Sequence, residues 1–299
     1  MNVAFKLKQL LFWVGYRMDQ RLPLRLCVAL RNRCMPWGGP ILDVVEIHIV
    51  DHCNLNCTGC LHFSPLAKKW FADAGRIERD LLALRRKFRY IRHVTLLGGE
   101  PLLHPEYERI VERVKRASPE SLITIVTNGV ALKGDSLDRF LDVCKKHGVR
   151  VKWTVYPPLR NRRDELVAAF RSAGVPMFTV EVGEHDFYVK MRPCGGDAAK
   201  SMRLCRKMTY CPYLRDGRLY TCAQAYHIKD YIKLYETETG NQGKMTASAG
   251  LDVHDEANDG WTILKYLMTP CETCRFCADR VRGIPWTQGF RSVRDWEVG

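Results

Sequence analysis

The spacing of apolar and polar positions from residue 41 onward predicts alternating strands and helices. Val44 to Val50 is apolar and rich in β-branched residues, which is typical of a buried strand. Arg76 to Ile91 carries apolar residues at the spacing of an amphipathic helix, and His93 to Leu97 predicts a second strand. The alternation continues with helices over 105–117, 135–146 and 163–173 and with strands over 121–127, 151–156 and 176–182. This order favours a parallel sheet with right-handed crossovers, so we expect an α/β fold built as a partial (β/α)6 TIM-like barrel.

The pattern changes after about residue 190. Two short apolar runs, 210–214 and 218–222, flank an Asp-Gly pair that is a strong hairpin signal. A polar segment over 236–260 follows, and a helix over 261–268 leads into the last cysteines. We therefore expect three parts, listed here in chain order: a basic N-terminal helical extension over 1–40, the barrel over 41–190, and a small cysteine-rich α+β domain over 191–299.

The N-terminal segment Met1 to Val14 superficially resembles a signal peptide, because Lys6 and Lys8 precede an apolar stretch. The stretch is too short for a signal peptide, and no small-residue cleavage site follows it. Its apolar residues instead recur at helical spacing, which favours a helix packed on the domain, with a membrane-surface helix as the alternative. No run approaches the roughly 18 apolar residues of a membrane span, so we expect no transmembrane segment.

Composition narrows the class of protein. A hydrophobic content of 46% over 299 residues is enough for a large core. Thirteen cysteines in a chain of this length fit metal or cluster ligation in a reducing cytosol better than a disulfide scaffold, so we expect a cytoplasmic location. The formal net charge of +14 suits an anionic partner such as a sugar nucleotide, a nucleic acid or an anionic lipid surface, and equally suits an ordinary solvated surface.

Three cysteines, Cys53, Cys57 and Cys60, follow the first predicted strand. Soft thiolates spaced Cys-x3-Cys-x2-Cys on one loop can converge on a single inorganic centre, and thiolates are the ligands of iron-sulfur clusters. Three ligands are one short of the usual four. The alternative is a zinc site completed by His52 or His62, which lie beside the trio.

Two further motifs come at the ends of the second and third predicted strands. The first is Gly98-Gly99-Glu100-Pro101, where glycines allow a backbone to approach a ligand and Glu100 can accept hydrogen bonds from an ammonium group. The second is Thr127-Asn128-Gly129, for which a plain turn is the alternative. The carboxyl ends of barrel strands form the catalytic face, so both motifs are expected beside the cysteine loop.

The cysteine loop and the Gly98–Pro101 segment together resemble the radical S-adenosylmethionine (SAM) superfamily. The resemblance implies that Cys53, Cys57 and Cys60 bind three irons of a [4Fe-4S] cluster and that SAM chelates the fourth iron through its amino and carboxylate groups. It also implies that an electron from the cluster cleaves SAM to a 5′-deoxyadenosyl radical, which abstracts hydrogen from a substrate. Gly98, Gly99, Glu100 and Pro101 would contact the methionine moiety, and Thr127 and Asn128 the ribose or carboxylate.

One position departs from the family pattern. The residue before the last loop cysteine is often aromatic in the family and packs on adenine, but in this chain it is Gly59. Phe63 or His62 could take its place, or adenine could rest on backbone alone. Hydrogen abstracted from the substrate is often replaced from a nearby thiol or phenol in such enzymes, and Cys194, Tyr156 and Tyr188 are the candidates.

The later cysteines resemble the auxiliary-cluster extensions called SPASM and twitch domains. Cys205, eleven residues, Gly217, four residues and Cys222 match their opening, and the resemblance implies that Cys205, Cys222, Cys271 and Cys274 hold an auxiliary [4Fe-4S] cluster. Cys211 or Cys277 could replace Cys205 or Cys274, and zinc is the alternative metal. No cysteine follows Cys277, so we expect one auxiliary cluster rather than two. The isolated Cys27, Cys34 and Cys144 are expected to be packing residues.

These expectations lead to one functional hypothesis and two alternatives. The hypothesis is a radical SAM enzyme that acts on a peptide or a sugar-derived small molecule and takes its electron from a flavodoxin or ferredoxin-like donor. The first alternative is a radical SAM enzyme that modifies nucleic acid, which the positive charge favours, although no single-strand-binding barrel is evident. The second is a non-enzymatic zinc-binding scaffold.

Overall fold

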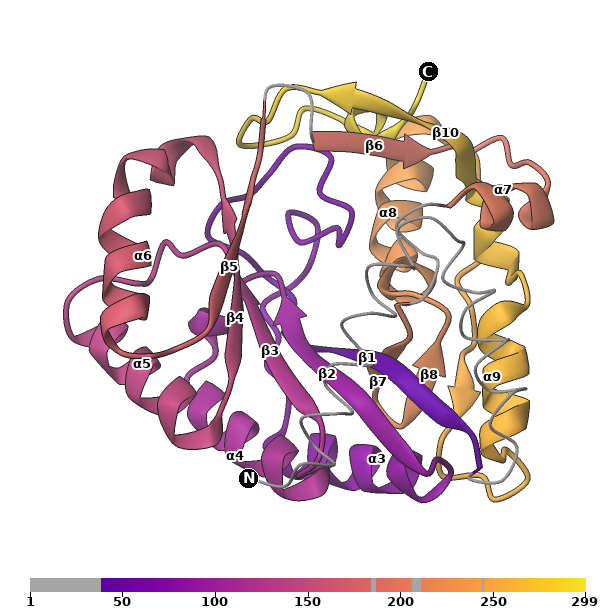
Figure 1. Ribbon diagram of the computed structural model, residues 1–299. Helices are drawn as coiled ribbons and strands as arrows, with labels where there is room; N and C mark the ends of the chain where they lie inside the picture. The colour runs from indigo at the N-terminus through magenta and orange to yellow at the C-terminus, as the bar shows by residue number, and fades with distance from the viewer. Residues whose placement is uncertain (1–38, 184–186, 206–210, 244) are drawn as a thin grey trace.

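The computed structural model describes residues 39–183, 187–205, 211–243 and 245–299 (Figure 1). The predicted N-terminal helix, nearly all of the basic extension, and Cys27 and Cys34 lie outside the described residues. Among the helices that are described, none combines the length and the apolar character needed to cross a bilayer.

Five parallel strands form one half of the fold. They pair in the order β5-β4-β3-β2-β1, and every neighbouring pair among them is parallel. Their bounds are Ile41–Val50 for β1, Tyr90–Gly98 for β2, Leu122–Thr127 for β3, Arg150–Val155 for β4 and Met177–Glu181 for β5. Each lies within a few residues of the strand predicted from apolar, β-branched runs, because these runs suit strands buried under helices. The α/β class and the partial barrel are therefore confirmed.

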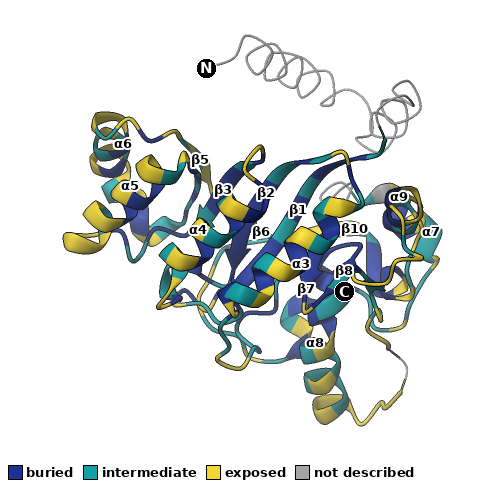
Figure 2. Ribbon diagram, turned by 90° about the horizontal axis from the view of Figure 1, so that it is seen from below, coloured by how far each residue is buried: buried dark blue, intermediate teal, exposed yellow. Residues whose placement is uncertain are grey.

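Four helices connect these strands and cover one face of the sheet. They are α3 at Ala74–Arg86, α4 at Tyr107–Ala117, α5 at Asp135–His147 and α6 at Arg163–Ser172. Helix α3 begins two residues before its predicted start because the side chain of Asp73 accepts a hydrogen bond from the backbone N–H of Arg76 and caps the helix. Each helix turns buried residues toward the sheet and exposed residues outward (Figure 2).

The two faces of the sheet differ in polarity. Side chains such as Ile47, Leu96 and Trp153 are fully buried in the main core with the helices. The alternate positions form a polar row across four strands, since Glu46 pairs with Thr95, Thr95 with Thr124, and Thr124 with Arg150. Successive side chains of a strand point to opposite faces, so this polar row lies on the face turned away from the helices.

The C-terminal segment adds strands to the same sheet. Strand β7 at Tyr213–Arg215 pairs parallel with β1, and β8 at Arg218–Tyr220 and β9 at Leu251–Asp252 follow in antiparallel pairing. The predicted hairpin is confirmed: Asp216 and Gly217 connect β7 to β8 with φ of 52° and 76°, the left-handed values that a two-residue turn of this kind requires. The sheet therefore has eight strands among the described residues.

The remaining elements form a second layer beside the barrel. They are α7 at Ala198–Leu204, α8 at Ala223–Thr239, α9 at Gly260–Met268, the 3₁₀ turns η4 at Glu272–Phe276 and η5 at Val293–Trp296, and an antiparallel pair of β6 at Phe187–Met191 with β10 at Cys277–Ile284. The β6–β10 pair lies on the side toward which the parallel strands run (Figure 1). The predicted boundary at residue 190 falls within β6, and as a domain boundary it stays a prediction.

Candidate functional site

The cysteine loop begins where β1 ends, at Val50. Cys57 is buried, and Cys53 and Cys60 are partly buried. Burial raises the pKa of both the Cys53 and the Cys57 thiol to about 12, and the charge of Cys60 adds to the increase for each. A negative charge on Cys60 thus disfavours the thiolate form of Cys53 and of Cys57, and a bound metal centre reverses that effect because it deprotonates coordinating thiols. The donor set fits the cluster that the sequence predicts.

The glycines of the Gly98–Pro101 segment let β2 end directly against this loop. A Cβ on Gly98 would lie 2.0 Å from the carbonyl oxygen of Val50, and one on Gly99 would lie 2.0 Å from that of His52. Their backbones are hydrogen-bonded instead, with Gly99 N donating to Val50 O at 2.9 Å and Glu100 N to His52 O at 3.1 Å. The close approach is to the chain's own backbone one and three residues before Cys53, a role in addition to the predicted ligand contact.

Glu100 joins the ends of β2 and β3. Its side chain is fully buried and accepts hydrogen bonds from Thr127 Oγ1 at 2.7 Å, Asn128 N at 2.7 Å and Leu102 N at 3.1 Å. Burial raises its pKa to about 7, and these hydrogen bonds offset part of the increase. A carboxylate offers about four lone-pair sites, so roughly one is left for an ammonium donor. The structure brings together three residues that the sequence had singled out separately.

Asn128 extends this network to the cysteine loop. Its Nδ2 donates to Asn54 Oδ1 at 2.8 Å and lies 3.5 Å from Cys53 Sγ, while its Oδ1 accepts from Val130 N. Behind it, Trp153 Nε1 donates to the carbonyl of Asn128 at 3.0 Å. Hydrogen bonds hold both the side-chain amide and the backbone carbonyl of Asn128, so the side chain is positioned to orient Cys53.

His52 and His62, either of which could complete a zinc site with the loop cysteines, differ in their surroundings. His62 Nδ1 lies 3.2 Å from the carbonyl oxygen of Gly98, and its ring stacks on His48 with centroids 4.8 Å apart. His52 packs against Phe71 with centroids 5.2 Å apart, and burial lowers its pKa. The neutral His52 imidazole can act as a metal ligand, whereas His62 already uses one nitrogen at the end of β2.

The position of Gly59 explains the missing aromatic residue. Gly59 has φ of 65°, and a Cβ there would lie 2.5 Å from Val189 Cγ1 and 2.9 Å from the carbonyl oxygen of Asp295. The C-terminal segment thus occupies the space that a larger side chain would need. Phe63 does not replace it, because its ring is fully buried against Tyr231 and Trp296 in a second core.

The three predicted hydrogen donors lie in different places. Tyr156, after β4, is close to the cysteine loop: burial raises its pKa well above the usual range, and the charges of Cys57, Cys60 and Cys53 add to this. Cys194 is exposed in the loop between β6 and α7, and Tyr188 lies on β6. Tyr156 therefore lies beside all three loop cysteines.

The later cysteines gather in a second group. One cavity is lined by Cys205, Cys222, Cys274 and Cys277, with Ser201, Met202 and Thr221. Cys271 lies beside this group, with Sγ 3.7 Å from Cys274 Sγ, and the hydrogen bond from Cys274 lowers the pKa of Cys271. The four ligands implied by the resemblance therefore come together, and so does Cys277, which the sequence offered as a replacement. Cys144 is buried in the main core as expected of a packing residue.

A buried lysine lies among these thiols and was missed by sequence reasoning. Lys190 on β6 is 4% exposed, and its Nζ lies 3.9 Å from Cys205 Sγ. Burial alone would lower its pKa, but the charges of Cys277, Cys205, Cys222 and Cys211 outweigh that effect and raise it. A fixed cation suits the excess negative charge of a four-thiolate cluster. One lysine within a strand gives no signal of such a role in the sequence.

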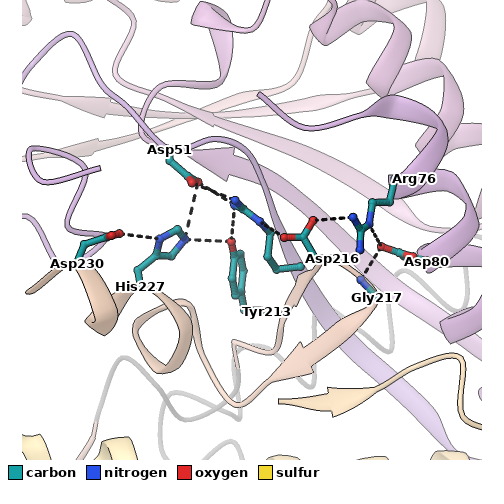
Figure 3. Close-up of polar contacts among 9 residues, drawn as sticks. Asp51, Arg76, Asp80, Tyr213, Asp216, Gly217, His227 and Asp230 are labelled. Carbon is teal, nitrogen blue, oxygen red and sulfur yellow. Dashed lines mark hydrogen bonds and ion pairs between the residues drawn. The ribbon is translucent and has the colours of Figure 1, made fainter. Parts of the chain in front are cut away.

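A second missed residue, Arg215, joins the β7 hairpin to the end of β1. Its guanidinium donates to Asp51 Oδ1 at 2.9 Å and Oδ2 at 3.1 Å and stacks 3.3 Å from the centre of the Trp70 ring. Figure 3 shows the acceptor Asp51 close to His227, whose ring is in turn hydrogen-bonded to Tyr213. Ligand atoms of His48, Asp51 and His227 lie within 4.8 Å of one another, which is close enough for a metal ion. Since Arg215 already neutralises Asp51, we interpret this cluster as an ion-paired support for the cysteine loop.

Comparison with known families agrees with this geometry. Residues 47–154 match the model of the Radical SAM superfamily, and this range contains the cysteine loop, the Gly98–Pro101 segment and Thr127-Asn128. Residues 47–154 therefore match the radical SAM domain, the class whose members use a [4Fe-4S] cluster and SAM.

Individual relatives match part of the chain. GTP 3′,8-cyclase of Streptomyces coelicolor is 33% identical over 112 residues, which is 34% of this chain and 32% of that protein. The same enzyme of Chlorobaculum tepidum is 34% identical over 112 residues, or 37% of this chain and 32% of that protein. The chain thus matches about a third of the length of these relatives. A solved structure of BtrN in complex with AdoMet and 2-DOIA covers 81% of this chain and 99% of its own, with 14% identity and a TM-score of 0.49.

Proposed function

We infer that this protein is a radical SAM enzyme that abstracts hydrogen from a peptide or a sugar-derived small molecule. The observation that carries the proposal is the convergence of three motifs at one end of the sheet. Asn128 after β3 joins the other two motifs, because its backbone N–H donates to the Glu100 carboxylate after β2 and its side-chain amide donates to Cys53 Sγ on the loop after β1. Glycines at 98 and 99 bring the second motif against the first.

When bound, a [4Fe-4S] cluster with an open iron supplies the electron that cleaves SAM and yields the hydrogen-abstracting radical. The chain's own residues have separate tasks. Cys53, Cys57 and Cys60 hold the cluster, and Asn128 fixes the orientation of Cys53. Glu100 offers a remaining acceptor site for the SAM ammonium group, and burial excludes water that would compete for it.

The second group of cysteines is proposed to hold an auxiliary [4Fe-4S] cluster. Four thiols line one cavity, and Lys190 supplies a buried positive charge beside them. Soft thiolate donors are the ligands of iron-sulfur clusters, and a nearby positive charge offsets the negative charge that such a cluster carries. A flavodoxin or ferredoxin-like protein is the proposed electron donor.

The proposed substrate class rests on the polar row of the sheet. Glu46, Thr95, Thr124 and Arg150 are in register on the face turned from the helices. Burial raises the pKa of Glu46 to about 7, and the charge of Lys152 on β4 offsets part of that increase. Charged groups of both signs with hydroxyls between them suit a substrate rich in hydrogen-bonding groups, such as a peptide or a sugar derivative. The relatives named GTP 3′,8-cyclase make a guanine nucleotide the second candidate, which the same polar row could also accommodate.

The test is anaerobic reconstitution with iron and sulfide, reduction, and quantification of 5′-deoxyadenosine formed from SAM. We expect turnover by the wild type and by Cys144→Ala, whose thiol is buried in the core away from the loop. We expect Cys57→Ala to form no 5′-deoxyadenosine. Product formation by Cys57→Ala, or none by the wild type with any reductant, would contradict the proposal, and a zinc-loaded, colourless protein would favour a metal-binding scaffold.

Adding peptides, aminosugars or GTP to this assay tests the substrate class. The substrate should increase 5′-deoxyadenosine formation and, when deuterated at the reacting carbon, transfer deuterium into it. Stimulation by GTP alone would favour the nucleotide over the peptide or sugar.

A further inference from the structure

The last residues of the chain lie against the cysteine loop. Thr58 N donates to the carbonyl of Thr287 at 2.9 Å, and Gly289 N donates to the carbonyl of Asn56 at 2.7 Å. Gln288 Nε2 adds a hydrogen bond to the carbonyl of Leu55 at 3.1 Å. Residues 286–289 therefore run along the loop between its first and last cysteines as an added strand would.

Two tryptophans anchor this segment. Trp296, fully buried, donates its indole N–H to the carbonyl of Cys60 at 2.8 Å. Trp286 donates its indole N–H to Cys57 Sγ at 3.1 Å, and its ring lies 5.6 Å from that of Tyr156. Residues 286–296, which we call the C-terminal clamp, thus contact the backbone of one cysteine and the sulfur of another.

The clamp requires a small residue in the loop. The atoms nearest to a Cβ at Gly59 belong to Val189, Ile284 and Asp295, so the β6–β10 pair and the clamp close on the loop at the position where the family often has an aromatic side chain.

We propose that the C-terminal clamp is part of the cluster site and that Trp286 is a positioning residue whose indole N–H sets the reduction potential of the cluster bound by Cys57. The inference rests on the proposed function, because it requires a cluster at the loop. A donor to a ligating sulfur stabilises the more negative, reduced cluster, and hydrogen bonds to the sulfurs are among the features that set such potentials. Trp286 therefore makes the cluster easier to reduce.

The test is a redox titration of the reconstituted protein in which EPR spectroscopy monitors the reduced clusters. The EPR signal that changes when SAM is added belongs to the loop cluster and gives its midpoint potential. This signal separates the loop cluster from an auxiliary one. Trp286→Phe keeps an aromatic ring beside Tyr156 but removes the donor, and we expect its midpoint potential to be more negative than that of the wild type. Trp261→Phe, on the exposed face of α9, is the matched control and should leave the potential unchanged. Equal potentials in Trp286→Phe and the wild type would overturn the proposal.

Gly59→Ala tests the clamp without altering Trp286. A Cβ there meets Val189 and the Asp295 carbonyl, so the clamp must move, and the potential should shift in the same direction as in Trp286→Phe. Gly174→Ala is its control, since Gly174 also has a left-handed φ, of 69°, but no atom within 4 Å of the added Cβ. An unchanged potential in Gly59→Ala would contradict the clamp.

A measurement on the wild type covers the case in which a variant fails to fold. Tryptophan labelled with ¹⁵N in the indole ring should give a ¹⁵N hyperfine coupling to the SAM-responsive cluster. Absence of that coupling in a protein that holds the cluster and forms 5′-deoxyadenosine would overturn the clamp and leave the proposed function intact. A protein with no cluster at the loop overturns both.

Discussion

Arg215 donates two hydrogen bonds to Asp51, at 2.9 and 3.1 Å, and so connects the β7 hairpin to the residue two positions before Cys53. The Arg215 side chain is 5% exposed and that of Asp51 12%, so the pair lies out of water. Planar, bidentate geometry of this kind fixes direction as well as distance. The C-terminal part of the chain thereby helps to define the start of the cysteine loop.

Removing Arg215 should destabilise the protein strongly. Arg215→Leu leaves the Asp51 carboxylate buried without its partner, a change that typically costs about 3–5 kcal/mol of unfolding free energy. Urea unfolding of the metal-free protein measures the loss. Arg139→Leu, which breaks an exposed pair with Glu108, is the control and should cost about 1 kcal/mol or less. Equal effects of the two substitutions would show that the buried pair does not support the loop.

Gly99→Ala should disrupt the contact between β2 and the loop. The added Cβ would lie 2.0 Å from the His52 carbonyl, which belongs to backbone and cannot turn away as a side chain can. We expect a loss of about 1–3 kcal/mol, as for overpacked cores, together with reduced iron binding at the loop. Gly75→Ala, in the first turn of α3 and without a close contact, should be neutral or stabilising. Normal iron content in Gly99→Ala would argue against this account of the glycines.

The raised pKa of Glu100 predicts that the stability of the folded protein depends on pH, and in which direction. Burial raises its pKa from 4.5 to about 7 in the folded protein. Between these values the folded state holds the proton while the unfolded state has released it, so stability decreases as pH rises from 4.5 to 7 and is constant above. In the metal-free protein, wild type should lose stability relative to Glu100→Gln across this window, on the order of 3 kcal/mol. A difference between the two proteins that does not change with pH would contradict the raised pKa.

Iron content should separate the two groups of cysteines. A chain with two [4Fe-4S] clusters binds about eight irons, and loss of one cluster leaves about four. We expect about four irons in Cys57→Ala and about four in Cys222→Ala, whereas Cys144→Ala should match the wild type. Full iron content in Cys222→Ala, or zinc in place of iron there, would rule out the auxiliary cluster.

The strands and helices of the barrel were predictable because their apolar spacing is local. Strands β1 to β5 and helices α3 to α6 follow from runs of ten or so residues, each buried on a regular pattern. Helix α8 was missed, since buried polar residues such as Gln224 and His227 interrupt its apolar spacing. The pairing of β6 with β10 was not predictable either, because it joins Met191 to Cys277 and neither strand carries a local signal for the other.

The residues of the candidate site likewise fall into those that the sequence predicted and those that it did not. The loop cysteines, Gly98–Pro101 and Thr127-Asn128 could be found because the residue types and spacing form motifs. Trp286, Lys190 and Arg215 are single residues without a motif, and their contacts depend on how distant parts of the chain fold together. Tertiary contacts of this kind are not encoded in any short window of sequence.

The most direct test of the central claim is to ask whether SAM binds the iron that the three loop cysteines leave open. Reduced, reconstituted protein should be examined by electron-nuclear double resonance with SAM labelled with ¹⁵N at the amino group and ¹⁷O at the carboxylate. We predict hyperfine coupling from both labels to the loop cluster, and its loss in Cys57→Ala. A loop cluster that is reduced and SAM-bound but shows neither coupling would contradict the account.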